Sequence, residues 1–262
     1  EADRISASLA EVMAFARTYP RITEVIVVDD GSTDHTGDLV TDAARTHAGK
    51  PPRLELVRHG VNRGKGASVR TGFEHATADI VLFSDADLSA PITEAPGLIE
   101  PIVCGQCDIA VGSRALDASC IELQQGFIRR SAGRMFNRMV RLMTGLPLQD
   151  TQCGFKAFRR LASQPVFSVQ RIEGFAFDVE LLYVARRLGL RLLELPVRWS
   201  HAEGSKVSML VHTWEMALDL LRIRWNDLLG RYRPHNGRGS ADPSGYASPS
   251  AGRAGTGSAP DP

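Results

Sequence analysis

Two aspartates, Asp85 and Asp87, stand one residue apart directly after the apolar run IVLFS. In an extended strand, side chains at i and i+2 point to the same face. Two carboxylates that close resist ionising together unless a cation lies between them. Mg²⁺ prefers one or two carboxylates together with phosphate oxygens. The pair therefore predicts a divalent-metal site for a phosphorylated ligand, although a D-x-D on its own is more often a surface turn.

A second acidic pair, Asp29 and Asp30, ends the apolar run EVIVV and is followed by the turn residues Gly31, Ser32 and Thr33. The run has no G-x-G-x-x-G dinucleotide fingerprint, and two carboxylates here would repel a pyrophosphate. They suit hydrogen bonds to a base or a ribose. A solvated turn that caps the next helix is an equally weighted interpretation.

The stretch GVNRGKGASVRTG (60–72) is a glycine-rich loop with basic residues that opens a predicted helix. It lacks the G-x-x-x-x-G-K-[ST] spacing of a phosphate loop, which argues against a kinase or an ATPase. Arg63 and Lys65 could still contact a nucleotide. A flexible turn with two exposed cations remains equally plausible.

The elements that must position these residues are apolar, β-branched runs alternating with helical patterns. Continuous apolar runs are typical of a parallel sheet covered on both faces. Ligands of such sheets bind at the carboxyl ends of the strands, where both acidic pairs lie. The predicted strands are 24–30, 53–59, 79–85, 107–114 and 191–199, and the predicted helices are 7–19, 34–48, 65–77, 93–104, 126–145, 177–188 and 208–232. In the 177–188 helix, Asp178 and Glu180 are interpreted as a cap or as partners of Arg186 and Arg187.

Composition excludes several classes of protein. The 262 residues carry a net charge of +1, which gives no reason to expect a nucleic-acid partner. No run of apolar residues is long enough for a transmembrane helix, and no secretory signal is found. Cys104 and Cys107 form a C-x-x-C without a second pair, so reduced cysteines of a cytosolic protein are favoured over zinc. Residues 233–262, rich in Gly, Ser, Pro and Ala, are expected to be disordered.

Taken together, VIVVDDGSTD, NRGKGASVRTG, DADLSAP and GSR (112–114) resemble the inverting glycosyltransferases of family 2, in order and in spacing. DTQCGFKAFRR (150–160), EGFAFDVELLYVA (173–185) and PVRWSHAEGSKVS (196–208) resemble the polyprenyl-phosphate sugar transferases within it, both dolichyl-phosphate glucosyltransferases and mannosyltransferases. The resemblance covers about residues 1–225. It implies an α/β GT-A fold with a mixed, mainly parallel sheet, and a catalytic domain at 1–232.

The resemblance also implies roles on the donor side of the site. Asp30 would contact the donor base, Asp29 would support the turn, and Lys65 would bind the nucleotide sugar. Asp87, assisted by Asp85, would bind Mg²⁺ or Mn²⁺ that bridges the donor diphosphate. Relatives on the mannose side often carry Gln as a further metal ligand where this chain has Ser89.

Other residues are implied on the acceptor side. Arg114 and Arg129 or Arg130 would neutralise the diphosphate and the lipid phosphate, and Asp150 would lie beside the acceptor. Back on the donor side, Ser205 and Lys206 would close over the phosphates of the nucleotide sugar from the C-terminal side. The family pattern also includes a first, central strand before the position of Glu1, which predicts an upstream segment.

The function implied is transfer of glucose from UDP-glucose to a polyprenyl or dolichyl phosphate, by a peripheral protein at the cytoplasmic face of a membrane. The arginine-edged 126–145 helix could lie on that membrane surface. Alternatives are transfer from GDP-mannose, transfer to a polysaccharide or surface glycan, and a non-catalytic nucleotide-binding scaffold. A metal-dependent nucleotidyltransferase is a weaker option.

Overall fold

The computed structural model describes residues 2–116, 137–200 and 209–233. Six strands and eight named helical segments are found there, and residues 137–144 are also helical. The strands are β1 (Glu24–Asp29), β2 (Arg53–Arg58), β3 (Ile80–Ser84), β4 (Ile109–Ser113), β5 (Phe155–Arg159) and β6 (Leu192–Pro196). The helices are α1 (Ala2–Thr18), α2 (Thr36–Thr46), α3 (Lys65–His75), the 3-10 turn η1 (Ile92–Glu94), α4 (Ala95–Val103), α6 (Arg160–Ser168), α7 (Phe177–Arg187) and α8 (Met209–Leu228).

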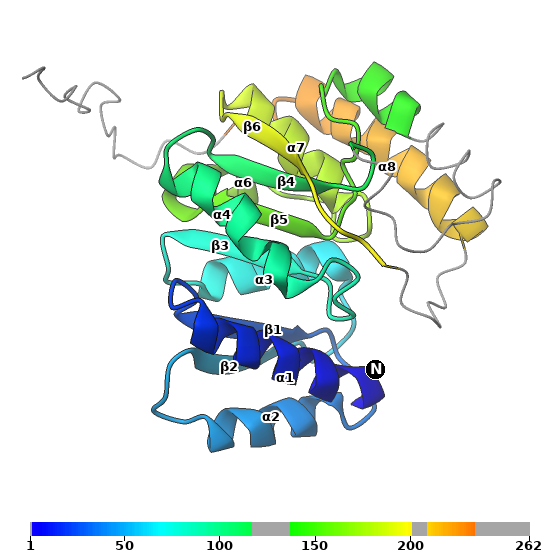
Figure 1. Cartoon of the computed structure of the whole chain (residues 1–262). Helices are drawn as coiled ribbons and strands as arrows, with labels where there is room; N and C mark the ends of the chain where they lie inside the picture. Colours follow the sequence, from blue (N-terminus) through cyan, green and yellow to red (C-terminus); the bar gives the residue numbers. More distant parts are fainter. Residues whose placement is uncertain (1, 117–136, 201–208, 234–262) are drawn as a thin grey trace, which may run out of the picture.

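The strands form two hydrogen-bonded groups with helices packed around them (Figure 1). β1 pairs in parallel with β2, and the second group has the order β3-β5-β4-β6. β4 and β6 are parallel, whereas β5 is antiparallel to both β3 and β4. The α/β class with a mixed sheet is confirmed. The mixed character comes from β5, which is absent from the predicted strands and runs antiparallel to both of its neighbours.

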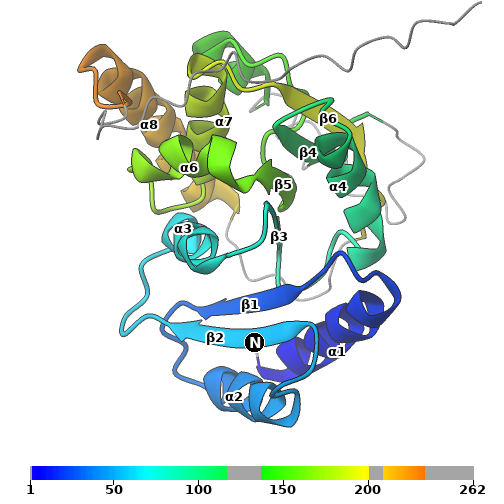
Figure 2. The same cartoon turned by 90° about the vertical axis from the view of Figure 1, so that its left-hand side faces the viewer.

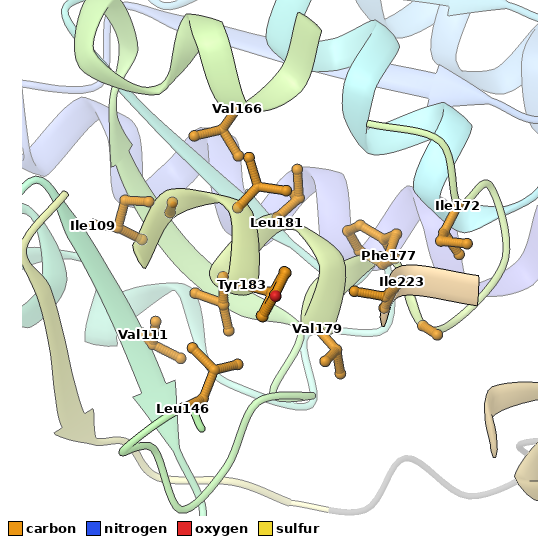
Figure 3. Close-up of a cluster of buried hydrophobic side chains, with 14 of the residues drawn as sticks. Ile109, Val111, Leu146, Val166, Ile172, Phe177, Val179, Leu181, Tyr183 and Ile223 are labelled. Carbon is orange, nitrogen blue, oxygen red and sulfur yellow. The ribbon is translucent and has the colours of Figure 1, made fainter. Parts of the chain in front are cut away.

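The main core lies around α7, whose residues 177–185 are all buried. Figure 3 shows side chains of α7, among them Phe177, Leu181 and Tyr183, close to Ile109 of β4 and Ile223 of α8. Such all-round burial is typical of a helix enclosed by other elements on every side. Its first residue, Phe177, also lies against Phe83 of β3, with the ring centroids 5.9 Å apart.

A cavity of about 400 Å³ separates the two groups of strands, between β1 and β3. Figure 2 shows β3 above β1, with α1 below β1 and α3 at one side. The apolar residues of these two strands are only half-buried, whereas every residue of β4 is buried.

Candidate active site

The carboxyl end of β1 holds Asp29 and Asp30 in different environments. Asp29 is buried, and its carboxylate accepts the backbone N–H of Ser32 at 2.9 Å and the Arg58 guanidinium at 3.0 Å. Asp29 thus closes the turn that begins at Gly31, as the sequence suggested. Gly31 has a φ of +75°, and a Cβ there would lie 2.7 Å from the Val61 carbonyl carbon.

Asp30 holds the glycine-rich loop in place. Its carboxylate accepts the backbone N–H groups of Arg63 at 3.0 Å and of Gly64 at 2.7 Å, and lies 2.6 Å from His59 Nδ1. Burial raises the pKa of Asp30, but the His59 contact and the two N–H donors together lower it by more than burial raises it. The net pKa therefore lies below the ordinary value. The Asp30 carboxylate is therefore an anion whose main contacts are within the protein.

The glycine-rich loop packs tightly against the segment before α7. The backbone N–H of Gly66 donates to the Glu173 carbonyl at 2.7 Å, and a Cβ on Gly64 would lie 2.5 Å from the same oxygen. Gly64 also has a φ of +100°. These glycines let α3 begin close to α7, which places Lys65, the first residue of α3, at the site.

The D-x-D pair lies in a turn rather than in a strand. β3 ends at Ser84, and the backbone N–H of Leu88 donates to the Asp85 carbonyl at 3.1 Å, so the argument from strand alternation was wrong. Leu88 has a φ of +48°, uncommon for a side chain of this size. Asp87 is exposed, and its Oδ1 accepts the backbone N–H of Ser89 at 3.0 Å. The turn therefore presents the Asp87 carboxylate outward.

The Asp85 carboxylate lies between Lys65 and the backbone at Gly154. Its Oδ1 pairs with Lys65 Nζ at 2.6 Å, and its carboxylate lies on Gly154, where an added Cβ would be only 2.1 Å from Oδ2. Burial lowers the pKa of Lys65, but Asp85, with contributions from Asp178 and Asp87, raises it above its ordinary value. The lysine is thus held as a cation between carboxylates at the end of the sheet.

The carboxylate oxygens of Asp85 and Asp87 suit a hard divalent ion such as Mg²⁺. In the part of the chain that the structure describes, no group of three His, Cys, Asp or Glu side chains could hold a metal ion. Asp87 and Asp85 alone would therefore need water or phosphate oxygens to complete the coordination shell, as Mg²⁺ commonly does. An ion there would share Asp85 with Lys65.

Arg114 follows β4 and forms a two-pronged ion pair with Asp150. Arg114 Nε lies 2.7 Å from Oδ2 and Nη2 lies 2.9 Å from Oδ1, while the guanidinium stacks 5.6 Å from the Trp199 ring centroid. Glu194 of β6 holds Asp150 in place, because its carboxylate accepts the backbone N–H of Asp150 at 2.8 Å. Burial raises the pKa of Asp150, but the Arg114 charge and the hydrogen bonds from Arg114 together lower it more, so the net pKa lies below the ordinary value. Asp150, predicted beside the acceptor, is thus the residue that orients Arg114.

A buried ion pair beneath the site was missed. Lys156, in the middle of β5, donates to Asp178 at 2.7 Å and to the Cys153 carbonyl at 2.5 Å. Both side chains are almost inaccessible, and burial raises the pKa of Asp178. The interpretation of Asp178 as a partner of Arg186 or Arg187 was wrong, because this side chain points inward to β5. A lysine within an otherwise apolar run was the available signal.

Glu180 also has partners other than those expected. Its carboxylate accepts the backbone N–H of Ile172 at 2.8 Å and the Tyr232 hydroxyl at 2.6 Å. Glu180 therefore ties the segment before α7 to the residues after α8, and it lies among core residues rather than on a helix surface.

Four predicted site residues, Arg129, Arg130, Ser205 and Lys206, lie outside the described residues. Among the other predicted residues, the structure brings together Lys65, Asp85 and Arg114 with its partner Asp150. Asp85 interacts electrostatically with both Lys65 and Arg114, which joins the ends of β3 and β4 to the start of α3. The cysteines that the structure describes are free: Cys107 and Cys153 are buried and Cys104 is exposed.

The chain is similar to known proteins along most of its length. The family model described as glycosyl transferase family 2 matches residues 1–167. The dolichyl-phosphate beta-glucosyltransferase of Saccharomyces cerevisiae is 32% identical over 247 residues, which cover 89% of this chain and 74% of the yeast protein. The Drosophila melanogaster protein of the same name is 35% identical over 244 residues, with the same two coverages.

A solved structure shows the same architecture. Glucosyl-3-phosphoglycerate synthase from Mycobacterium tuberculosis, in complex with Mn²⁺, UDP-glucose and phosphoglyceric acid, has a TM-score of 0.54 and 20% identity. The alignment covers 85% of this chain and 75% of that one. With a family match over well over half of its residues and relatives above 30% identity, the chain belongs to glycosyl transferase family 2, adopts the GT-A fold and is a glycosyltransferase.

Proposed function

We propose that this chain transfers glucose from UDP-glucose to dolichyl phosphate or a related polyprenyl phosphate, with inversion at the anomeric carbon. The observation that carries this proposal is the meeting of the Asp85–Asp87 turn with two cations, Lys65 and Arg114, at one end of the sheet. A sugar diphosphate is an anion that needs such cations. The relatives named above act on dolichyl phosphate by name, which supports the acceptor.

The chemistry requires little of the protein beyond positioning and charge. A lipid phosphate is already an anion at neutral pH, so it can attack the anomeric carbon without a strong general base. Asp150 would hold Arg114 toward the phosphates, and Lys65 would stabilise the departing diphosphate. Asp87 and Asp85 would hold Mg²⁺ or Mn²⁺, which when bound neutralises charge on the diphosphate. The Mycobacterium tuberculosis synthase, which has the same fold, is in complex with Mn²⁺ and UDP-glucose.

The remaining site residues keep donor-side or acceptor-side roles in this proposal. Asp29 and Asp30 would shape the pocket for the base, with Asp30 acting through the glycine-rich loop. Arg129 and Arg130 would meet the lipid phosphate, and Ser205 and Lys206 would close over the donor. Residues 1–232 would form one catalytic domain, followed by a tail at 233–262.

A membrane surface fits one side of α8. The exposed apolar residues of α8 share one stripe with Leu229, which directly follows the helix; this is hereafter the apolar stripe: Leu218, Leu221, Trp225, Leu228 and Leu229. The opposite side of the helix, with Leu220 and Ile223, is fully buried in the core. Across the described ranges, no helix combines the length and the apolarity needed to cross a bilayer. We propose peripheral binding at the cytoplasmic face of a membrane, where the acceptor lipid would be presented.

Sugar transfer tests the proposed reaction directly. Labelled UDP-glucose and GDP-mannose are incubated with dolichyl phosphate and Mg²⁺, and the lipid-extractable label is counted. We expect label from UDP-glucose, and a loss of at least about 100-fold in Asp87→Asn, since one charge-stabilising group is commonly worth that factor. Asp42→Asn, an exposed aspartate on α2, is the matched control. Label from GDP-mannose alone would refute UDP-glucose as the donor. Full activity of Asp87→Asn would refute the proposed metal site.

Vesicle co-sedimentation tests the membrane surface. The double variant Trp225→Ser/Leu228→Ser removes the two most exposed residues of the apolar stripe and should weaken binding to phospholipid vesicles. Leu161→Ser on α6 removes an equally exposed leucine elsewhere and should leave binding unchanged. Equal losses in both variants would contradict a specific role of the stripe.

A further inference from the structure

We propose, on the basis of the phosphate-binding role given to Arg114 in the proposed function, that Trp199 is a positioning residue that holds Arg114 toward those phosphates. The guanidinium carbon of Arg114 lies 5.6 Å from the centroid of the Trp199 ring. A ring face attracts a cation within about 6 Å of its centroid. Asp150 holds the same guanidinium by two hydrogen bonds, so the ring adds a second restraint. The Arg114 side chain is 32% exposed, which leaves part of its charge open to an anion.

Trp199 is itself held in place by the protein around it. Its side chain is half-buried and packs against the apolar cluster that includes Val197. The backbone N–H of Val197 donates to the carbonyl of Ser113, at the end of β4, at 3.2 Å. Arg198 Nε donates to the Glu94 carboxylate at 2.6 Å. The indole ring is therefore carried by a segment that is fixed on two sides, and it can restrain Arg114 without moving with it.

The same segment also reaches the D-x-D turn. The backbone N–H of Ser200 donates to the Ser89 carbonyl at 2.8 Å, and the backbone N–H of Ser89 donates to Asp87 Oδ1 at 3.0 Å. Two adjacent residues, Trp199 and Ser200, thus contact the arginine and the acidic turn. This segment links the position of the Arg114 cation to that of the Asp87 carboxylate, and both groups would face one diphosphate.

Two substitutions separate a positioning role from simple packing. Trp199→Phe keeps an aromatic face and most of the apolar contacts, whereas Trp199→Leu keeps apolar bulk without a π-system. A residue that only filled space would lose stability in both variants and would give no special protection to the aromatic one. A residue that positions Arg114 should be rescued by Phe.

A double-mutant cycle in the sugar-transfer assay described above tests this role. We expect Trp199→Leu to lower kcat/KM for the donor at least about fivefold, the factor that a partly desolvated cation–π contact is worth, and Trp199→Phe to stay within about twofold of the parent. In the Arg114→Gln background, Trp199→Leu should have almost no further effect, because the group that it positions is gone. Phe15→Leu on α1, which replaces an aromatic residue against the same apolar cluster, is the control and should keep the parent activity.

Losses that add in the Trp199→Leu/Arg114→Gln variant would overturn the positioning role. So would equal losses in Trp199→Phe and Trp199→Leu. Circular dichroism checks that each variant is folded. Should Trp199→Leu fail to fold, Trp199→Met, with a longer and more adaptable apolar side chain, takes its place in the cycle.

Binding of pyrophosphate with Mn²⁺, measured by isothermal titration calorimetry, separates this role from the proposed function. Pyrophosphate carries the charge of a diphosphate without a base or a sugar. Its Kd should rise at least about fivefold in Trp199→Leu and remain near the parent value in Trp199→Phe. That result with a parent that transfers no sugar would refute the proposed function and support the positioning role. Glucose transfer by the parent, together with additive losses and unchanged pyrophosphate binding, would do the opposite. A parent that neither transfers sugar nor binds pyrophosphate would refute both.

Discussion

Replacing Asp150 by Asn should destabilise the fold and remove sugar transfer together. The Asp150 side chain is 3% exposed and accepts Arg114 at 2.7 and 2.9 Å, so its charge is buried and paired. Removing one partner of a buried pair costs about 3–5 kcal/mol. The Arg114 side chain is 32% exposed, so water can solvate part of its charge, and we expect a loss near the lower limit, about 3 kcal/mol.

Asp108 offers a matched control at the other end of β4. It also forms a two-pronged ion pair, with Arg191 at 3.0 and 2.9 Å, but the Arg191 side chain is 55% exposed. Asp108→Asn should therefore lose much less stability and retain transfer. Urea unfolding monitored by circular dichroism measures the stabilities, and lipid-extractable label measures transfer at a temperature where both variants are folded. Equal stability losses, or full activity of Asp150→Asn, would refute the reasoning.

The same pair makes a prediction about pH. The pKa of Asp150 is lower in the folded protein than the ordinary value of about 3.9 in an unfolded chain. The unfolded state therefore takes up the proton first on acidification, and stability from this group is complete above about pH 5 and is lost as the pH falls below about 4. The stability difference between the parent and Asp150→Asn should shrink over that range. A stability difference that does not change with pH would show that the charge of Asp150 is not the source of that difference.

Two further variants test the packing beneath the site. Lys156→Met should lower the free energy of unfolding in urea by about 3–5 kcal/mol, because Asp178 stays buried without its cation. The double variant Lys156→Met/Asp178→Leu should recover most of that stability. A double variant as unstable as the single one would contradict this explanation. Gly154→Ala should push the Asp85 carboxylate away and reduce transfer at least about tenfold, because a displacement of about 1 Å in a site can cost that much or more. Gly97→Ala, where the added Cβ meets nothing within 4 Å, is the control, and equal activity of the two variants would contradict the steric argument.

Local sequence patterns predicted most of the elements and the edge of the sheet at which the acids meet. The β-branched run before Asp29 and the apolar run before Asp85 are short, continuous and flanked by turn residues. Short β-branched runs bounded by turn residues favour strands over helices. Because ligands of such sheets bind where the strands end, those runs also led to the prediction of Asp29, Asp30, Asp85 and Asp87 as site residues.

Patterns failed where distant residues decide the outcome. β5 was missed because Lys156 interrupts its apolar run, and its burial is tolerated only because Asp178 arrives from another element. Asp178 was assigned to nearby arginines because neighbours on a helix are all that a sequence shows. The D-x-D was placed in a strand, yet Gly154 and Lys65 hold it in a turn.

The amino-acid sequence by itself therefore determined the α/β class, the family resemblance and the identity of the acidic strand ends, since these depend on residues adjacent in the chain. Only the tertiary structure decided which charge meets which. It paired Arg114 with Asp150, turned Asp30 toward the glycine-rich loop and set Asp178 against Lys156. The physical reason is that burial makes an unpaired charge costly, and the partner that removes this cost lies far away along the chain.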